Sequence, residues 1–299
     1  MGKHLAVLLL CLLCVQLSAQ STMQFLNVNP DAATSAVAGT GIARPATAYA
    51  IENNLAAAAL SESRMAFSAG YGIWQPAVSR TGVVSAGGFF RIGDSFALAA
   101  GFKNFAAPAY SYVTEEGISA VSFKPGEMSV SLGGALKLSD ALSLGLDAKF
   151  ARSSLADFAK ASSLAADVSL AYCSGGFSAG LAVSNIGGKV RYSGSDSSYS
   201  MPMAARAGAA YSIAGFTASA EFDYLFSGVF MAGLGAEYRI KEIVALRAGY
   251  HFGDSVRAIP SYASAGLGLN FFGVSLDASY LFASGTLGGT MMFGLGYSF

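Results

Sequence analysis

Large apolar residues alternate with small or polar residues along most of this sequence, and this alternation restricts the fold more than any other feature. In residues 141–150 the even positions carry Leu, Ala or Phe, and the odd positions carry Ala, Ser, Gly, Asp or Lys. A period of two over such a length is typical of a β-strand whose two faces meet different surroundings. A tilted strand of about 9–11 residues is also long enough to cross a bilayer.

The same period returns in other segments, where mid-strand charges fall on the face opposite the large apolar side chains. It is seen in residues 162–172, 216–226, 230–240, 243–252 and 274–282. A soluble two-sheet sandwich also alternates, but its polar face meets water and carries many Lys and Glu. Only 12% of this chain is charged, and the polar faces are mostly Gly, Ala and Ser. We therefore expect an all-β protein, a transmembrane antiparallel β-barrel whose narrow lumen is largely filled by its own side chains.

The alternation predicts about fourteen strands joined by connections of alternating length. The expected strands are 64–74, 80–92, 95–105, 127–138, 141–151, 162–173, 176–185, 203–213, 215–226, 229–240, 242–252, 261–271, 273–283 and 289–299. Tight turns follow the even strands, and longer links follow several odd ones, at 106–126, 152–161, 186–202 and 253–260. Short turns on one rim and longer loops on the other are typical of outer-membrane barrels. We expect an integral protein of the bacterial outer membrane, in contact with outer-membrane lipid, with both ends of the barrel on the periplasmic side.

The first residues are expected to leave the protein on export. Residues 1–19 combine a basic start at Lys3, an apolar stretch at 5–17 and small residues before a cleavage site after Ala19. This is the pattern of a secretory signal peptide. The apolar stretch, about 13 residues long, is shorter than the roughly 20 residues that a membrane helix needs.

Residues 20–63 form a separate N-terminal segment before the barrel at 64–299. The segment lacks the alternation, is rich in Ala, and has a short helix expected within 46–60 that starts at Thr47. A helix with so weak a polar face needs another surface to pack on. We expect the segment to plug the lumen from the periplasmic side; the alternative is a loose periplasmic tail. The candidate plug residues are Glu52, Asn53 and Asn54.

Ten charged residues fall on the polar faces of the predicted strands and are candidate lumen-lining residues. A charge in the middle of the lipid-facing surface costs about 2–4 kcal/mol, so these side chains are expected to face inward. They either pair with one another and the plug, which would close the barrel, or they line a polar path for a permeant. The residues are Asp147, Lys149, Asp167, Arg206, Glu221, Asp223, Glu237, Arg239, Arg247 and Asp277.

The residue patterns do not favour catalysis. Residues 176–180 read G-x-S-x-G, and Asp223 and His251 follow Ser178 in the order of the α/β-hydrolases. That motif needs a strand, a sharp turn and a helix, whereas the alternation here continues through it. We expect a non-enzymatic protein with no catalytic residue, and an outer-membrane lipid hydrolase is a remote alternative. His251 is expected to be a polar residue of the outer rim.

No cofactor is expected from the composition. One His and one Cys remain after the signal peptide, which is too few for a His/Cys metal site. The formal net charge is zero and the chain has no basic cluster, so nucleic acid is not expected as a partner.

Several segments resemble the PorV/PorQ family of outer-membrane barrels, which is related to the FadL long-chain fatty-acid transporters. Segment 29–43 resembles the opening of the family, and segment 50–60 resembles its Asn-Pro-Ala segment, with Leu55 where the family has Pro. Later matches lie at 115–136, 142–150 and 164–172. The most informative stretches are Asn185-Ile186-Gly187, Pro202 with Arg206-Ala207-Gly208, and Glu237-Tyr238 with Leu246-Arg247-Ala248-Gly249-Tyr250.

The resemblance implies a fourteen-stranded barrel with an N-terminal plug. It also implies a part in protein export to the cell surface or in envelope assembly, with the type IX secretion translocon and cargo that carries a sorting domain as partners. The kinship with FadL implies an alternative, a channel for small hydrophobic molecules.

Overall fold

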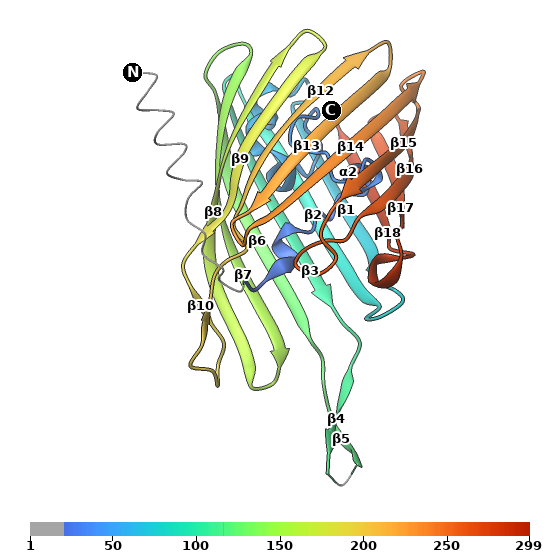
Figure 1. Cartoon of the computed structure of the whole chain (residues 1–299). Helices are drawn as coiled ribbons and strands as arrows, with labels where there is room; N and C mark the ends of the chain where they lie inside the picture. The colour runs from blue at the N-terminus through green and yellow to red at the C-terminus, as the bar shows by residue number, and fades with distance from the viewer. Residues whose placement is uncertain (1–20, 116) are drawn as a thin grey trace.

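Fourteen strands form one closed antiparallel barrel in a computed structural model that describes residues 21–115 and 117–299 (Figure 1). Neighbours along the chain pair with each other, and β1 pairs with β18 to close the barrel. The wall strands are β1 (Met65–Trp74), β2 (Thr81–Ile92), β3 (Phe96–Ala106), β6 (Gly126–Lys137), β7 (Leu142–Ala156), β8 (Ala159–Ser174), β9 (Phe177–Gly187), β12 (Ala204–Ile213), β13 (Phe216–Leu225), β14 (Val229–Ile240), β15 (Val244–Phe252), β16 (Tyr262–Phe271), β17 (Val274–Phe282) and β18 (Met291–Ser298). The predicted fourteen-stranded antiparallel barrel is confirmed; the predicted signal peptide lies outside the described residues.

Among the residues that the structure describes, no helix is both long and apolar enough to cross a membrane.

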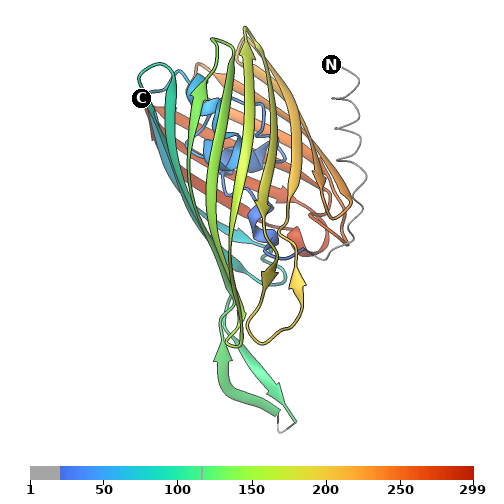
Figure 2. The ribbon, with the colours of Figure 1, turned by 90° about the vertical axis from the view of Figure 1, so that its left-hand side faces the viewer.

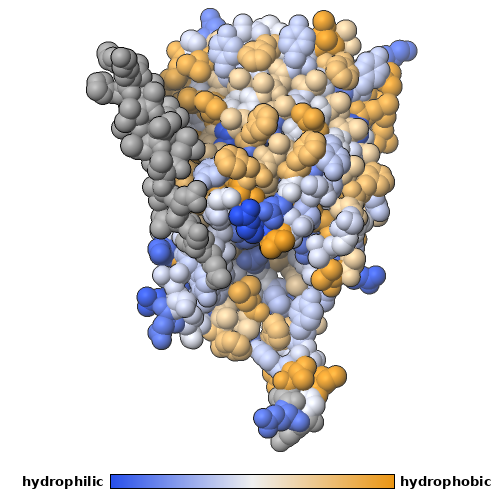
Figure 3. Space-filling view, in the orientation of Figure 1, coloured by the Kyte–Doolittle hydropathy of each residue, from blue (hydrophilic) through white to orange (hydrophobic). Residues whose placement is uncertain are grey.

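The two faces of each strand have the surroundings that the alternation predicts. On β7, Leu146 is 53% exposed on the outer surface, whereas the next residue, Asp147, is 8% exposed and faces the lumen. Figure 3 shows apolar side chains over much of the outer wall. Lipid contact stabilises such a surface, and closure of the sheet pairs every strand edge, so that no backbone edge meets the hydrocarbon.

The two rims differ in the length of their connections. One rim carries the two- to four-residue turns and is called the short-turn end; it also carries the start of β1 and the end of β18. The β16–β17 turn there uses Phe272 and Gly273, both with positive φ (52° and 80°), as the favoured two-residue hairpin turns require. The opposite rim is called the long-loop end. In outer-membrane barrels these rims face the periplasm and the outside, respectively.

The long-loop end carries small elements that the alternation did not predict. The link after β3 contains a hairpin of β4 (Tyr110–Thr114) and β5 (Gly117–Phe123), which projects far beyond the barrel (Figures 1 and 2). The link after β9 contains β10 (Val190–Arg191) and β11 (Ser198–Tyr199), and the link after β17 contains η3 (Gly285–Leu287). In the β15–β16 loop the backbone N–H groups of Val256 and Arg257 donate to Asp254 and lower the pKa of its carboxyl.

One predicted loop is wrong. Residues 152–161 were expected to form a long link, but β7 and β8 continue through them and meet at a turn of residues 157–158. The strands leave the membrane there, and their outward register pairs are Arg152 with Ser162 and Ser154 with Lys160, so the alternation that marks a lipid-facing strand ends. Their inward face remains packed, because Ala151 and Ser153 are completely buried.

The N-terminal segment lies inside the barrel (Figures 1 and 2). Its elements are η1 (Gln24–Asn27), α2 (Ala32–Ala36), α3 (Ala50–Asn53) and η2 (Leu55–Leu60). The single helix expected within 46–60 is wrong, because Asn54 is extended (φ −158°) and separates α3 from η2. The Thr47 hydroxyl accepts a hydrogen bond from the Tyr49 N–H, and α3 itself begins only at Ala50.

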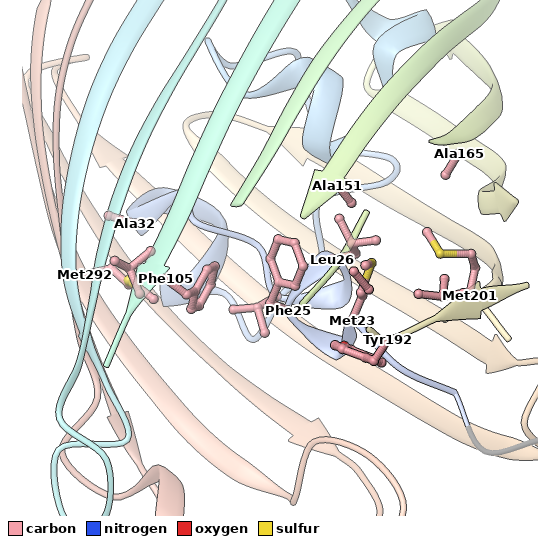
Figure 4. Close-up of a cluster of buried hydrophobic side chains, with 14 residues drawn as sticks. Met23, Phe25, Leu26, Ala32, Phe105, Ala151, Ala165, Tyr192, Met201 and Met292 are labelled. Atoms are coloured by element: carbon pink, nitrogen blue, oxygen red, sulfur yellow. The ribbon is translucent and has the colours of Figure 1, made fainter. Parts of the chain in front are cut away.

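The start of this segment lies at the long-loop end and not at the periplasmic side, where we expected the whole segment. The Thr22 N–H donates to the Ser200 carbonyl over 3.0 Å, and the Thr22 and Tyr192 hydroxyls are 2.7 Å apart. Met23 is 2% exposed and packs with Tyr192 and Met201 (Figure 4). The segment therefore runs the length of the lumen, from the 188–203 loop to the short-turn end where β1 begins.

We predict that Leu146→Arg will reduce assembly strongly, whereas Leu155→Arg on the same strand will reduce it little. The two leucines are similarly exposed, at 53% and 48%, but only Leu146 lies in the lipid-facing stretch. Arg at mid-membrane costs about 2–4 kcal/mol and almost nothing at the rim. The measurement is the folded fraction after refolding into lipid vesicles, read from heat-modifiable gel mobility. Equal loss in both variants would contradict the assigned membrane position.

A second prediction concerns the direction of the barrel in the membrane. With Cys173 replaced by Ser, cysteines introduced at Ser111 or Ser195 should react with an impermeant thiol reagent on intact cells. A cysteine at Asp140, in the fully exposed turn between β6 and β7, should react only after the cells are broken. Labelling of all three positions on intact cells would reject the orientation.

Candidate functional site

The lumen is the candidate functional site, and small inward residues make room in it for the N-terminal segment. A Cβ atom added to Gly249 would lie 2.6 Å from the Val37 carbonyl carbon, and one added to Gly145 would lie 2.6 Å from the Ala56 nitrogen. Backbone thus approaches backbone at positions where any side chain would collide. The expectation that the wall fills the lumen with its own side chains is wrong, because the N-terminal segment occupies that space.

Hydroxyl groups of the wall bond directly to the backbone of the segment. The Ser143 hydroxyl donates to the Ala56 carbonyl over 2.7 Å, and the Ser178 hydroxyl donates to the Ala43 carbonyl over 2.6 Å. Irregular backbone inside a barrel needs such partners, since an unpaired buried carbonyl costs about 1–3 kcal/mol. The Ser-rich inward faces therefore serve as acceptors and donors for a segment with little regular structure.

Lys103 is the most deeply buried cation and ties the segment to β3. Its ammonium donates to the carbonyls of Leu26 and Val28 over 3.0 and 3.1 Å, and to Glu52 Oε2 over 2.8 Å. Lys103 is 1% exposed, so all of its hydration is replaced by these three oxygens. They come from two distant parts of the segment, and one side chain therefore holds both η1 and α3.

Arg206 and Glu221 form a second attachment near the middle of the lumen. Arg206 Nε lies 3.0 Å from Glu221 Oε1, and its Nη1 donates to the Asn53 carbonyl over 3.1 Å. Glu221 Oε2 in turn accepts the backbone N–H of Ile42 over 2.8 Å. The ion pair joins β12 to β13, and its remaining donors and acceptors bond to the N-terminal segment.

A third group of charges lies toward the short-turn end around Glu237. This carboxylate accepts from Arg247 Nε (2.5 Å), from Arg239 Nε (2.8 Å) and from Nη2 of Arg44 (2.8 Å). Arg247 also reaches Asp277 at 2.5 Å. Arg44 belongs to the N-terminal segment, so this cluster joins three wall strands to it.

The fourth group lies where β8 and β9 change register. Lys149 Nζ lies 2.6 Å from Asp167 Oδ2, and the Asn185 N–H donates to Asp167 Oδ1 over 2.8 Å. Asn185 has φ +59° and stands in a β-bulge, where two residues of β9 face one of β8. A bulge re-aims a side chain; here the Asn185 amide reaches Asn27 of the segment over 2.9 Å.

The structure brings most of the predicted lumen residues together around the segment. Nine of the ten take part in the ion pairs given above or below, and Arg239 is the most exposed of them, at 46%. Asp223 lies 3.5 Å from Arg206 Nε. Asp147 differs, because it is buried and its Oδ1 has no hydrogen-bond partner among the described residues.

The three predicted residues of the segment have distinct places. Glu52 meets Lys103, as described. The Asn53 amide donates to the Thr34 hydroxyl over 3.1 Å and bonds the two halves of the segment together. The Asn54 amide donates to the Ile42 carbonyl over 2.7 Å and to the Leu170 carbonyl of β8 over 3.0 Å.

Sequence reasoning missed Lys103 and Arg44. The signal for Lys103 was present, since it stands at an inward position of the strand predicted at 95–105, in phase with Ala97 and Ala99. Arg44 lies in an irregular segment without periodicity, so only the structure could assign its partner.

Among the cavities formed by the described residues, two lie within the lumen on opposite sides of the N-terminal segment. The larger, about 540 Å³, opens at the short-turn end and includes Asp31, Tyr49 and Arg247 in its wall. The smaller, about 100 Å³, lies toward the long-loop end and is lined by Trp74, Tyr262, charged side chains and parts of the segment. The two cavities share no lining residue, so the segment separates them.

The residues weighed for catalysis do not form a site. Ser178 lies within strand β9 and its hydroxyl is bonded to Ala43. His251 lies near the end of β15 at the long-loop rim, as expected, but it is 6% exposed and its ring is stacked on Tyr262 with 4.9 Å between the ring centroids. In the described part of the chain, no group of three or more His, Cys, Asp or Glu could hold a metal ion.

Taken together, the closed strands, the lipid-facing apolar wall and the filled lumen define an outer-membrane barrel with an internal N-terminal segment. The sequence model of one family, described as type IX secretion system protein PorV, matches residues 16–218, well over half of the 299 residues. The chain belongs to this family and is an integral protein of the bacterial outer membrane. No curated protein matches the chain.

Solved structures of other barrels share the fold. The toluene transporter TbuX of Ralstonia pickettii superposes with a TM-score of 0.65 at 14% identity, over 91% of this chain and 98% of that one. The toluene transporter TodX of Pseudomonas putida gives 0.63 at 13% identity, over 89% and 95%. A FadL homologue of Pseudomonas aeruginosa gives 0.55 at 14% identity, over 91% and 98%. The FadL-type architecture suggested by the sequence is therefore confirmed.

We predict that Lys103→Met will destabilise the barrel far more than Lys241→Met, which alters an exposed cation at a turn. Loss of Lys103 leaves Glu52 buried without a counter-charge, which costs about 3–5 kcal/mol. The double variant Lys103→Met/Glu52→Leu should recover part of this loss, because it removes both charges. The measurement is the urea midpoint of unfolding in detergent micelles. A Lys103→Met protein as stable as the Lys241→Met control would show that the pair does not hold the segment.

Proposed function

We propose that this protein is a non-enzymatic, permanently plugged barrel of the type IX secretion system, which binds protein partners at its outer face. The observation that carries the proposal is the filled lumen: four separate groups of charges attach the N-terminal segment to the wall. A lumen held in this way is poorly suited to rapid passage of solutes. The surfaces that project from the membrane are then the parts that can bind partners.

The β4–β5 hairpin supports an outward-facing docking role. It extends beyond every other connection (Figure 2), and Val113 and Ile118 near its tip are each 80% exposed. Water-exposed apolar groups of this kind on a projecting hairpin mark a site of protein contact. We propose that translocon components or exported cargo with a sorting domain bind there.

The placement of Ser178 supports the non-enzymatic part of the proposal. Ser178, the one residue in a hydrolase-like motif, is held in a strand, and its hydroxyl is used to bind the N-terminal segment. A nucleophile needs a base within hydrogen-bond reach, and Ser178 bonds only carbonyls.

The small cavity favours one alternative function, a FadL-like channel for small hydrophobic molecules. Its wall includes Trp74, Leu225, Met231 and Leu281 beside charged groups, and apolar walls with a few polar groups are typical of ligand sites. Its volume of about 100 Å³ is smaller than the 300–1,000 Å³ usual for small-molecule sites.

The export role is tested with a hairpin variant. Val113→Ser/Ile118→Ser should reduce surface delivery of a reporter that carries a sorting domain, and should reduce co-purification of the translocon from native outer membrane. Val256→Ser is the matched control, because Val256 is 89% exposed on another long loop. Normal delivery of the reporter by the folded double variant would show that the β4–β5 hairpin is not the docking site.

The plug is tested by conductance in planar bilayers. The intact protein should be nearly silent, and a protein lacking residues 21–62 should conduct strongly, because a polar lumen without its filling admits ions. A folded deletion variant that stays silent would reject the plug. Saturable binding of toluene or a long-chain amphiphile to intact protein, measured calorimetrically, would favour the channel alternative.

A further inference from the structure

The outer wall at the long-loop end changes abruptly from apolar to cationic. On β7 the outward residues from Leu142 to Phe150 are apolar, and the next outward residue is Arg152. On β8, Leu164 is the register partner of Phe150, and the exposed residue four positions before it is Lys160. Arg152 pairs with Ser162 and Ser154 with Lys160, so the two cations are diagonal neighbours on one face.

The adjoining strand β10 adds two more cations to the same surface. The Ser193 N–H donates to the Lys160 carbonyl over 2.9 Å, which places this loop beside β8. Val190 and Tyr192 are buried, and the Tyr192 hydroxyl donates inward to Ser153 over 3.0 Å. Lys189 and Arg191 alternate with them and are exposed, so they point outward. We call Arg152, Lys160, Lys189 and Arg191 the cationic belt.

The belt cations are not held in ion pairs within the part of the chain that the structure describes. Among the described residues, none of the four belt side chains forms an ion pair. Asp157 and Asp196, the carboxylates of the adjoining turns, form none with the belt either. This contrasts with the lumen, where the buried cations are paired, and it leaves four exposed cations whose charge no ion pair within the described residues neutralises. Hydrophilic side chains gather in this region, near the β10–β11 hairpin at the lower left (Figure 3).

The height of the belt coincides with the headgroup region. The apolar stretch 142–150 has nine residues, close to the 9–11 residues with which a tilted strand crosses the hydrocarbon. Arg152 and Lys160 therefore stand just past its boundary, at the rim that faces outward. Acyl chains that cover Phe150 and Leu164 place their headgroups directly against the belt.

From this placement we propose that the cationic belt binds the phosphorylated headgroup of an outer-leaflet lipid. Arg guanidinium groups bind phosphate oxygens bidentately and Lys adds a mobile positive charge. Each cation near an anionic lipid surface contributes to binding, and the apolar residues below hold the acyl chains of the same molecule. The site is independent of the proposed export role, and it would fix one particular lipid to the β7–β8–β10 side of the barrel.

The test compares lipid binding by intact full-length protein and by a neutralised belt. Native mass spectrometry in detergent should show bisphosphorylated lipid A bound to the wild-type protein. The variant Arg152→Gln/Lys160→Gln/Arg191→Gln should bind it at least tenfold more weakly, since it removes three of the four cations that attract the anionic headgroup. The matched control is Arg80→Gln/Lys124→Gln/Lys241→Gln, which removes three exposed cations elsewhere and should bind normally. Heat-modifiable gel mobility verifies that each protein is folded.

Two further arms separate the possible ligands. Enzymatically dephosphorylated lipid A should bind at least tenfold more weakly to wild-type protein, and inorganic phosphate at equal concentration should not compete. Equal binding of lipid A by wild-type protein and belt variant would overturn the proposal. Equal binding of the dephosphorylated lipid, or displacement of lipid A by inorganic phosphate alone, would also overturn it.

Discussion

Most of the charges inside this barrel are paired, and the rest of the structure depends on that pairing. The lumen holds carboxylates and cations that lipid does not reach and that are mostly buried, and a buried charge without a partner is strongly destabilising. Wall residues alone do not complete the pairs. Lys103 has its carboxylate partner on α3, and Glu237 needs Arg44 as one of its three cations. The wall and the N-terminal segment therefore supply counter-charges to each other.

The same requirement accounts for the composition of the wall. Large side chains face lipid, while glycine, alanine and serine face inward, because backbone of the segment lies where their side chains would be. Gly145 and Gly249 leave space for close approach, and Ser143 and Ser178 satisfy carbonyls that have no helical or strand partner. Few residues of this chain are charged, and many of those that are lie where the wall meets the N-terminal segment.

The wall could be predicted from sequence almost completely, because each strand carries its own period-two signal. Prediction failed where that signal stops. β7 and β8 continue past Phe150 and Leu164 with outward residues that meet water. The sequence of this extension therefore predicted a loop. Asn54 breaks the expected helix because its amide binds both Ile42 and Leu170, a tertiary contact that no local propensity contains. The alternation along each strand predicts which charged residues face the lumen. It does not predict their partners in the N-terminal segment, because the irregular backbone of that segment has no repeating pattern.

The path of the N-terminal segment has a mechanical consequence. One end is covalently continuous with β1 at the short-turn end, and the other is bonded to Ser200 and Tyr192 of the 188–203 loop at the opposite rim. Withdrawal toward the periplasm would carry residues 21–28 along the whole length of the barrel, past every attachment in the lumen. A pull on the outer loop loads only the terminal contacts first. Release from the outside therefore begins at a few contacts, whereas withdrawal toward the cell interior must break all of them.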